Sequence, residues 1–291
     1  MAHEFTTTKP AIFDRADLDW LQYVETRRAD KTNMTGNMSD DPRVLNRDTY
    51  DLLQPGIPFE VWLDQEQTAV NERIAAIKSL YNFSKIGRPR PEHGVTVIQL
   101  DKDIDSVSDE NDATNRIFAD ATLLTTPGYA SMIPPADCIV ATVAYPSKKA
   151  VGQIHVGFRG AARNIVASSL EQFKDKGLDP SEAVVYFSPH VQSGFPLNEA
   201  ETAELYQILD SMPVEQRRTV EKYLRGTTSH PVMDLTGLAL DEFRQSHVPD
   251  DNIQTSAQDT FSDPTLFSDF KKNGHRYTGR FGVIAGIKEI S

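Results

Sequence analysis

The sequence has little cysteine, no long apolar run and a shortage of positive charge, and each of these features excludes a class of protein. A single cysteine in 291 residues rules out an intrachain disulfide framework. The longest apolar run, CIVATVAY, spans eight residues, far short of the about 20 that a membrane-spanning helix needs. Lys and Arg total 30 against 42 Asp and Glu, a formal net charge of -12, so the chain lacks the charge that drives nucleic-acid binding.

The remaining composition is that of an ordinary globular protein. Hydrophobic residues make up 39% and charged residues 25% of the chain, which is long enough to bury a sizeable core. The N-terminal sequence MAHEFTTTKP lacks the apolar segment of a signal peptide. We therefore expect a soluble cytoplasmic protein that binds neither a membrane nor a nucleic acid. Its oligomeric state does not follow from the sequence.

Hydrophobic periodicity predicts a mixed α and β chain. Short stretches rich in β-branched residues are typical of strands, and apolar residues at helical spacing are typical of amphipathic helices. The expected strands are 95–100, 138–145, 150–157, 183–188 and 281–288, and the expected helices are 66–80, 162–176, 199–212, 214–225 and 234–245. The strands are few, and two of them are consecutive, which favours an α+β fold over a doubly wound sheet.

The most informative segment, 136–160, predicts a β-hairpin around the turn-like sequence PSKK. Pairing of Tyr145 with Ala150 would set its register. That register places Cys138 and His155 on the same face as diagonal neighbours. A thiol and an imidazole that converge have two chemical uses: the imidazole can activate the thiol as a nucleophile, or both can bind a metal ion such as Zn²⁺.

The sequence GFRG, which ends this segment, suits the binding of an anion. Gly157 and Gly160 permit a close approach of the backbone, and Arg159 offers a guanidinium fork that fits phosphate or carboxylate. The N-terminus of the following helix would add N–H donors. Plainer alternatives stay open, since a lone cysteine is often a small buried hydrophobe and Arg159 could serve a structural salt bridge.

These motifs resemble those of a known family. ADC followed by a hairpin and HVGFRG is similar to the ADC and HxGWRG motifs of the multicopper polyphenol oxidase or laccase-domain family. Members of that family have also been described as peptidoglycan editing factors and as purine nucleoside phosphorylases. The family's metal ligands are His, Cys and His, and the first of them matches the HG of PEHGVTVIQL. The resemblance therefore implies that His93, Cys138 and His155 bind one metal ion.

Further segments match the family in order from about residue 26 to 290. NMTGNMSDDPRVLNR resembles the family's NLGxHVGDDPxxVxxNR, and the C-terminal LFSDFKKNGHRYTGR resembles FFSYRRDGxTGR. These matches imply that Asn33, Arg47 and, less directly, Arg280 bind substrate. The resemblance also implies an N-terminal extension over 1–25 and one domain over 26–291. In that domain two packed mixed β-sheets are flanked by helices in a layered α/β/β/α sandwich.

The chemistry implied by the resemblance is that of a zinc enzyme acting on nucleosides. Two histidines and a thiolate leave an open position on a tetrahedral zinc ion. Water bound there has a pKa of about 7 and can displace ammonia from C6 of a purine. Phosphorolysis needs a guanidinium that holds phosphate in line, for which Arg47 and Arg159 are the candidates. We expect a zinc-dependent purine nucleoside phosphorylase acting on adenosine or inosine, with adenosine deamination as a second activity.

Three alternatives stay open: a metal-free cysteine hydrolase with Cys138 as nucleophile and His155 as base, the copper-dependent polyphenol oxidase of the older family label, and a non-catalytic binding protein. Copper fits less well than zinc, because the chain has seven histidines and no His-x-His pair. Pro91 and Glu92 replace the family's Gln and Val, and SPHVQSG lacks its cysteines, which leaves the pocket and the nucleoside undetermined. We expect His190, within SPHVQSG, to lie in a solvated loop.

Overall fold

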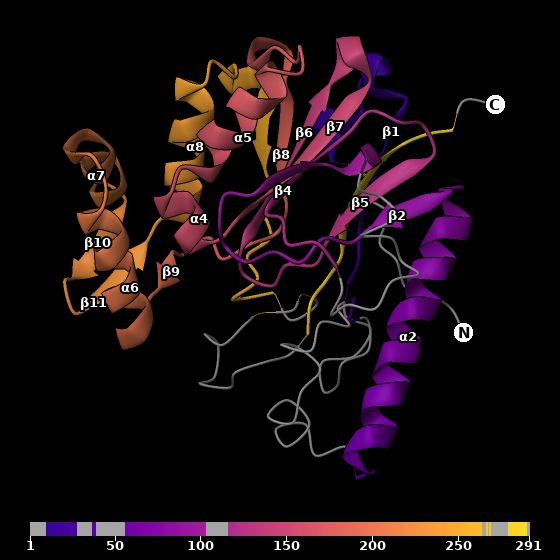
Figure 1. Cartoon of the computed structure of the whole chain (residues 1–291), viewed down its shortest axis with the longest axis horizontal. Helices are drawn as coiled ribbons and strands as arrows, with labels where there is room; N and C mark the ends of the chain where they lie inside the picture. The colour runs from indigo at the N-terminus through magenta and orange to yellow at the C-terminus, as the bar shows by residue number, and fades with distance from the viewer. Residues whose placement is uncertain are drawn as a thin grey trace.

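The β-strands of the protein form three sheets (Figure 1). The computed structural model describes residues 10–27, 37–38, 56–102, 116–263, 266, 268 and 279–289, so Asn33 and Arg47 lie outside the described residues. The strands are β1 (Leu21–Glu25), β2 (Lys85–Gly87), β3 (Val97–Gln99), β4 (Ala121–Leu124), β5 (Tyr129–Ile133), β6 (Ile139–Tyr145), β7 (Ala150–Val156), β8 (Val184–Phe187), β9 (Phe195–Pro196), β10 (Leu224–Thr227), β11 (His230–Met233), β12 (Ile253–Thr255) and β13 (Val283–Ile287). The helices are α2 (Phe59–Leu80), α4 (Phe158–Ala162), α5 (Ile165–Lys174), α6 (Glu199–Asp210), α7 (Val214–Glu221) and α8 (Leu235–Gln245).

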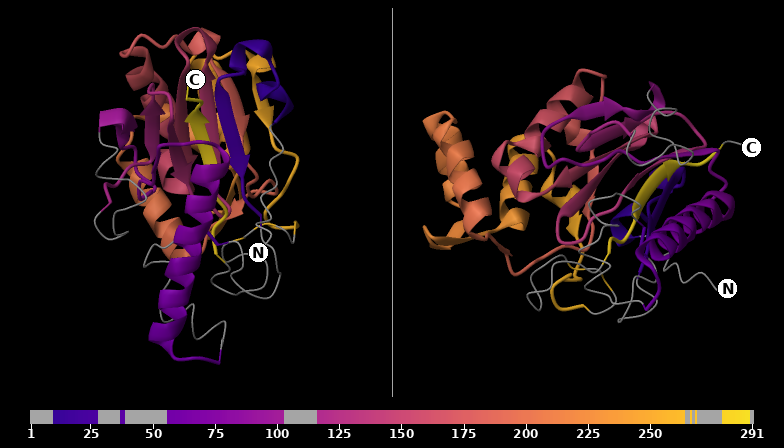
Figure 2. Two further views of the ribbon diagram at one scale, coloured as in Figure 1. Left: turned by 90° about the vertical axis from the view of Figure 1, so that its right-hand side faces the viewer. Right: turned by 60° about the horizontal axis from the view of Figure 1, so that its bottom comes forward.

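Two of the sheets stack face to face, and helices cover their outer faces (Figures 1 and 2). The four-stranded sheet has the order β1-β13-β5-β2, and the six-stranded sheet has the order β12-β8-β6-β7-β4-β3. Between them lies a core in which Tyr23 and Val283 of one sheet share a cluster with Val140 and Val151 of the other. This arrangement confirms the single α+β domain with two packed sheets that the resemblance implied.

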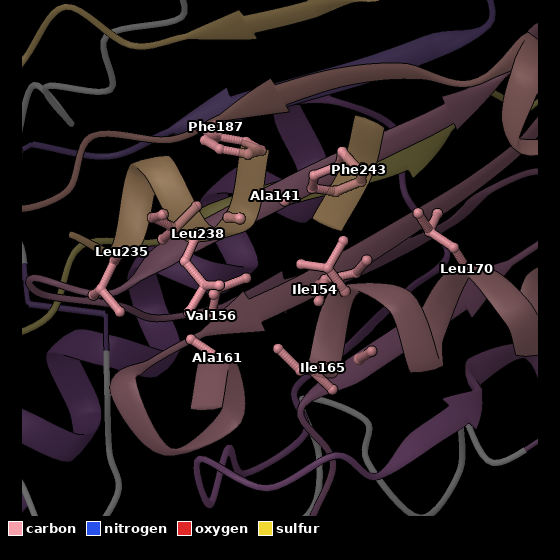
Figure 3. Close-up of a cluster of buried hydrophobic side chains, with 14 of the residues drawn as sticks. Ala141, Ile154, Val156, Ala161, Ile165, Leu170, Phe187, Leu235, Leu238 and Phe243 are labelled. Atoms are coloured by element: carbon pink, nitrogen blue, oxygen red, sulfur yellow. The ribbon is translucent and has the colours of Figure 1, made fainter. Parts of the chain in front are cut away.

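Separate apolar clusters hold the helices on the outer faces. Helix α2 buries Ile74 and Ile77 in a cluster with the outer face of the four-stranded sheet. Helices α5 and α8 cover the six-stranded sheet, where Leu170 and Phe243 share a cluster with Ile154 (Figure 3). The four layers are therefore α2, the four-stranded sheet, the six-stranded sheet, and the layer of α4, α5 and α8.

The predicted hairpin is confirmed in strands and register. Tyr145 pairs with Ala150, and Val140 pairs with His155. Every residue of β6 and β7 is buried, because one face of the sheet meets helices and the other meets a second sheet. Both strands therefore appear in the sequence as nearly continuous apolar runs. Lys149 closes the turn with a left-handed φ of 47°.

The structure differs from the sequence-based expectation in two respects, and it also shows where part of the N-terminal segment lies. Strands are not few, because short strands such as β2, β9 and β12 complete the sheets. A third sheet, β10-β11-β9, lies beside α6 and α7, and its β10 occupies positions 224 and 225, which were expected to be helical. The part of the predicted N-terminal extension that is described, 10–25, contributes β1 and the buried Phe13 and Leu18 to the core between the sheets.

Helix α5 begins without a capping side chain of its own. Asn164 at its N-cap has a left-handed φ of 59°, and its side chain makes no capping hydrogen bond. Glu242 of α8 supplies the acceptor instead, since its Oε2 accepts the N–H groups of Val166 at 3.1 Å and Ala167 at 3.2 Å. Burial raises the pKa of the Glu242 carboxyl to about 8. The docking of α8 on α5 thus includes a titratable group.

The raised pKa of Glu242 should make the free energy of unfolding depend on pH. A group whose pKa is higher in the folded than in the unfolded chain stabilises the fold fully below its unfolded pKa, 4.5, and loses that contribution as the pH rises to about 8. We expect the wild type to lose on the order of 2–3 kcal/mol relative to Glu242→Gln between about pH 5 and about pH 8.5. Urea unfolding of both proteins in chelator measures this difference; a difference that stays constant with pH would contradict the prediction.

Candidate metal centre

Three side chains from three segments converge at one end of the two-sheet sandwich. His93 precedes β3, Cys138 immediately precedes β6, and His155 lies near the end of β7. One donor atom of each lies within 4.8 Å of the donors of the other two. Cys138 Sγ is 3.8 Å from His93 Nε2, and the centroids of the two imidazole rings are 4.8 Å apart. The hairpin register and the loop before β3 thus bring together the three residues that the sequence singled out as metal ligands.

A buried carboxylate that sequence reasoning missed contacts both histidine segments. Asp120, 1% exposed, accepts the backbone N–H groups of Glu92 and His93 at Oδ1 and that of Gly94 at Oδ2, at 2.7 to 3.1 Å. Its Oδ1 also lies 3.4 Å from Nδ1 of His155, and its carbonyl accepts the His155 N–H at 2.7 Å. The only sequence signal was a single Asp in ADATLLTTPG, a segment that also matches the family.

The donor set and its spacing fit a metal ion bound by nitrogen and sulfur. Imidazole nitrogen and thiolate sulfur bound to a tetrahedral zinc at about 2.1 and about 2.3 Å lie about 3.6 Å apart. The distance from Cys138 Sγ to His93 Nε2 is 3.8 Å. His155 turns Nδ1 toward a carboxylate, as metal-bound histidines do, which leaves Nε2 as the available ligand atom. These residues could therefore hold a metal ion with small side-chain movements.

The glycines of GFRG make room for this convergence. A Cβ atom at Gly157 would lie 2.3 Å from Cδ2 of His93 and 3.2 Å from Sγ of Cys138. A Cβ atom at Gly160 would lie 3.0 Å from the carbonyl oxygen of Gly94. Both glycines thus allow the HG segment to approach the end of β7.

The arginines predicted to bind substrate have other partners in the structure. Arg159 Nε donates to Glu204 Oε1 of α6 at 2.6 Å, and its guanidinium lies 4.4 Å from the centroid of the Phe158 ring. The structural salt bridge considered for this residue is therefore present. Arg280 donates its backbone N–H to Asn37 Oδ1 and its Nη1 to the Gly279 carbonyl.

A second buried carboxylate holds the neighbouring loop against Cys138. Asp137 Oδ1 accepts the hydroxyl groups of Thr260 at 2.7 Å and Ser268 at 2.8 Å. The carbonyl of the same residue accepts the N–H of Val191. The segments after β8 and β12 therefore both close against the start of β6.

The expectation for His190 is wrong, because this side chain is buried. Its Nδ1 donates to the Ser188 carbonyl at 2.7 Å, and its Nε2 lies 2.8 Å from the Thr236 hydroxyl of α8. Burial lowers the pKa of His190, so the neutral imidazole is the stable form. The segment SPHVQSG looks polar in sequence, but only part of it is solvated: His190 is buried and forms an isolated bridge with Asp259, whereas Gln192 and Ser193 are exposed.

With this geometry established, comparison with known proteins identifies the family. A family model described as multi-copper polyphenol oxidoreductase laccase matches residues 28–288. The chain belongs to this family. Relatives include two proteins named purine nucleoside phosphorylase. The one from Rickettsia conorii is 21% identical over 72% of this chain and 80% of its own length, and the one from Rickettsia prowazekii is 22% identical over 72% and 82%.

Solved structures of similar shape support the fold. The Bacillus licheniformis hypothetical protein YfiH superposes with a TM-score of 0.71 at 15% identity, covering 93% of this chain and 95% of its own. YlmD from Geobacillus stearothermophilus gives 0.70 at 17% identity, with 94% of each chain covered. Neisseria meningitidis protein NMB0706 gives 0.65 at 17% identity, with 98% and 99% covered. Among the residues described here, no helix has the length and apolar character to cross a membrane.

The close contacts at Gly157 indicate that Gly157→Ala should disturb the candidate metal site and leave the fold intact. The Gly157 backbone has a φ of -91°, which any residue adopts, so the added methyl group of Gly157→Ala would act through the side chains it meets, those of His93 and Cys138. We expect zinc affinity, measured by competition with a chromophoric chelator, to fall by about tenfold or more. Ala162→Gly is the control, since it perturbs the same short helix without adding an atom beside His93. Equal affinities of Gly157→Ala and wild type would contradict the prediction.

Proposed function

We propose that the protein is a zinc-dependent purine nucleoside phosphorylase that cleaves adenosine or inosine with phosphate and also deaminates adenosine. The observation that carries the proposal is the convergence of one thiol and two imidazoles within 4.8 Å. The names of the two rickettsial relatives support the substrate class. At 21% and 22% identity this support concerns the type of reaction and leaves the particular nucleoside open.

The residues of the site would hold the ion and present it to the substrate. When bound, zinc would supply a Lewis acid and lower the pKa of a coordinated water to about 7. The thiolate of Cys138 contributes negative charge, and His155 presents Nε2 because Nδ1 faces Asp120. Three protein ligands leave a fourth position for water or substrate, as in catalytic rather than structural zinc sites.

The family description names copper, but the residues favour zinc. A multicopper oxidase needs several histidine-rich sites. Within the described part of the chain, one group of three or more metal-binding side chains is found. The whole sequence contains seven histidines. Zinc, which needs a single site and no electron acceptor, is therefore the proposed cofactor.

Phosphorolysis also needs an anion site. It replaces the bond between the purine nitrogen and the ribose anomeric carbon with a bond to phosphate oxygen, so a cation must hold the phosphate in line. We propose Arg47, Arg280 and Asn33 as substrate-binding residues, in keeping with the family match. Arg159 donates its Nε–H to Glu204 in an ion pair that is about a third exposed, so as a phosphate ligand it would use its other N–H groups or exchange Glu204 for phosphate.

A second candidate function is a metal-free cysteine hydrolase. The 3.8 Å contact between Cys138 Sγ and His93 Nε2 is the observation that favours it. This contact makes His93 a second candidate base beside His155. The two functions differ in their need for metal, because a chelator should abolish the first and leave the second intact.

Cys138→Ala tests the zinc proposal. Two imidazoles alone make a poor zinc site, so metal content and both reactions should be lost together. The fold should survive, with a loss of about 1 kcal/mol and a shift in Tm of a few degrees. The assay follows adenine and inosine separately from adenosine, with and without phosphate. An active Cys138→Ala protein would exclude the zinc and the thiol mechanisms alike.

Arg159→Ala, paired with Glu204→Ala, tests the anion site. If Arg159 holds phosphate, Arg159→Ala should reduce phosphorolysis about tenfold or more while deamination, which uses water, is spared. Glu204→Ala, which frees the guanidinium, should then keep or raise phosphorolysis. If the ion pair is structural, the two variants should behave alike in both reactions.

A further inference from the structure

We propose that Asp120 is a positioning residue that shapes the metal site through both histidines, and that its negative charge makes the site favour a divalent ion over Cu⁺. This inference rests on the proposed metal binding and goes beyond it, because it assigns the choice of ion to a residue that does not bind the metal. The observation that carries it is a single buried carboxylate that contacts both histidine segments.

The first part of the argument concerns the HG segment. His93 has a left-handed φ of 62°, a conformation that costs a non-glycine residue about 1 kcal/mol or more. The N–H groups of three consecutive residues, 92–94, point at the Asp120 carboxylate. Successive N–H groups arranged in this way form a concave anion site, and here its occupant is a side chain of the same protein. Asp120 therefore stabilises the backbone conformation that directs the His93 ring toward Cys138.

The second part concerns His155. Its Nδ1 lies 3.4 Å from the same Oδ1 that accepts the His93 N–H, and its backbone N–H donates to the Asp120 carbonyl. A carboxylate beside Nδ1 favours the tautomer that carries the proton there, which leaves Nε2 as the ligand atom. Asp120 thus fixes the ring orientation and the tautomer of His155 and the backbone conformation of His93.

The third part concerns charge. Two neutral imidazoles and the Cys138 thiolate carry one negative charge, and the Asp120 carboxylate adds a second in the same buried environment. A divalent ion balances the charge of these ligands and of Asp120, whereas Cu⁺ leaves this group of residues with one net negative charge.

Asp120→Asn separates these effects because it keeps the shape and removes the charge. Its amide oxygen can still accept the N–H groups at the Oδ1 position, while its amide nitrogen would face the Gly94 N–H. Asp101→Asn is the matched control. Asp101 also accepts the N–H groups of a loop, at Thr125 and Thr126, but lies beyond the opposite ends of the paired strands β3 and β4.

The experiment measures Zn²⁺ and Cu⁺ affinities of the full-length wild type and both variants by competition with chromophoric chelators, anaerobically for Cu⁺. We expect Asp120→Asn to lower Zn²⁺ affinity by about 10- to 100-fold and Cu⁺ affinity by about 3- to 10-fold, because the Coulomb energy of the lost charge is half as large for a monovalent ion. Asp101→Asn should leave both affinities unchanged. Nitrogen-15 NMR of metal-free wild type should show the His155 proton on Nδ1, a measurement that does not depend on how any variant folds.

Three results would overturn the inference. These are an unchanged Zn²⁺ affinity in folded Asp120→Asn, an equal loss of both ions, and a wild-type His155 with its proton on Nε2. Failure of the proposed function looks different. A wild type that binds zinc with the expected tautomer but does not cleave nucleosides would refute the phosphorylase and support the role of Asp120. A wild type that binds neither ion would overturn both.

Discussion

The register of the β6–β7 hairpin is the constraint on which the site depends. Both strands are buried on both faces, so a slip of one residue would exchange the side chains that face the helices with those that face the second sheet. His155 shares its face with Val151, which lies in the core between the sheets. Pairing of β7 with β4 then brings Asp120 beside His155, and pairing of β6 with β8 brings the 188–191 segment beside Cys138.

The elements that could be predicted from sequence are those with a strong local signal. Strands such as β6, β7 and β13 are runs of small and β-branched residues, and helices α5, α6 and α8 show clear helical spacing. Strands β2, β9 and β12 are two or three residues long, too short for any period, and exist because a neighbouring strand offers hydrogen bonds. Positions 224 and 225 continue an apparently helical pattern, but pairing with β11 makes them a strand.

The residues of the site also differ in how well the sequence predicts them. Residues of rare types within known motifs could be predicted, whereas residues that act through contacts made only in the folded chain could not. His93, Cys138 and His155 could be found because few thiols and imidazoles occur in the chain and their motifs match a family. Asp120 could not, because its main partners are backbone N–H groups, which leave no trace in the sequence. The partner of Arg159 lies on a different helix and is 45 positions away, so the GFRG motif alone left open whether Arg159 binds an anion or forms a structural salt bridge.

The cap on α5 sets an order of assembly. Its acceptor, Glu242, lies 76 positions after Val166 in the chain, and no side chain nearer in sequence replaces it at the N-cap. During synthesis from the N-terminus, α5 therefore emerges with the N–H groups of its first turn unmatched, and they gain their acceptor only once α8 has been made and docked. The face of the six-stranded sheet that α5 and α8 share remains unfinished until then. Helix α5, in the middle of the chain, therefore reaches its final packing only after α8, in the last quarter of the chain, has been synthesised.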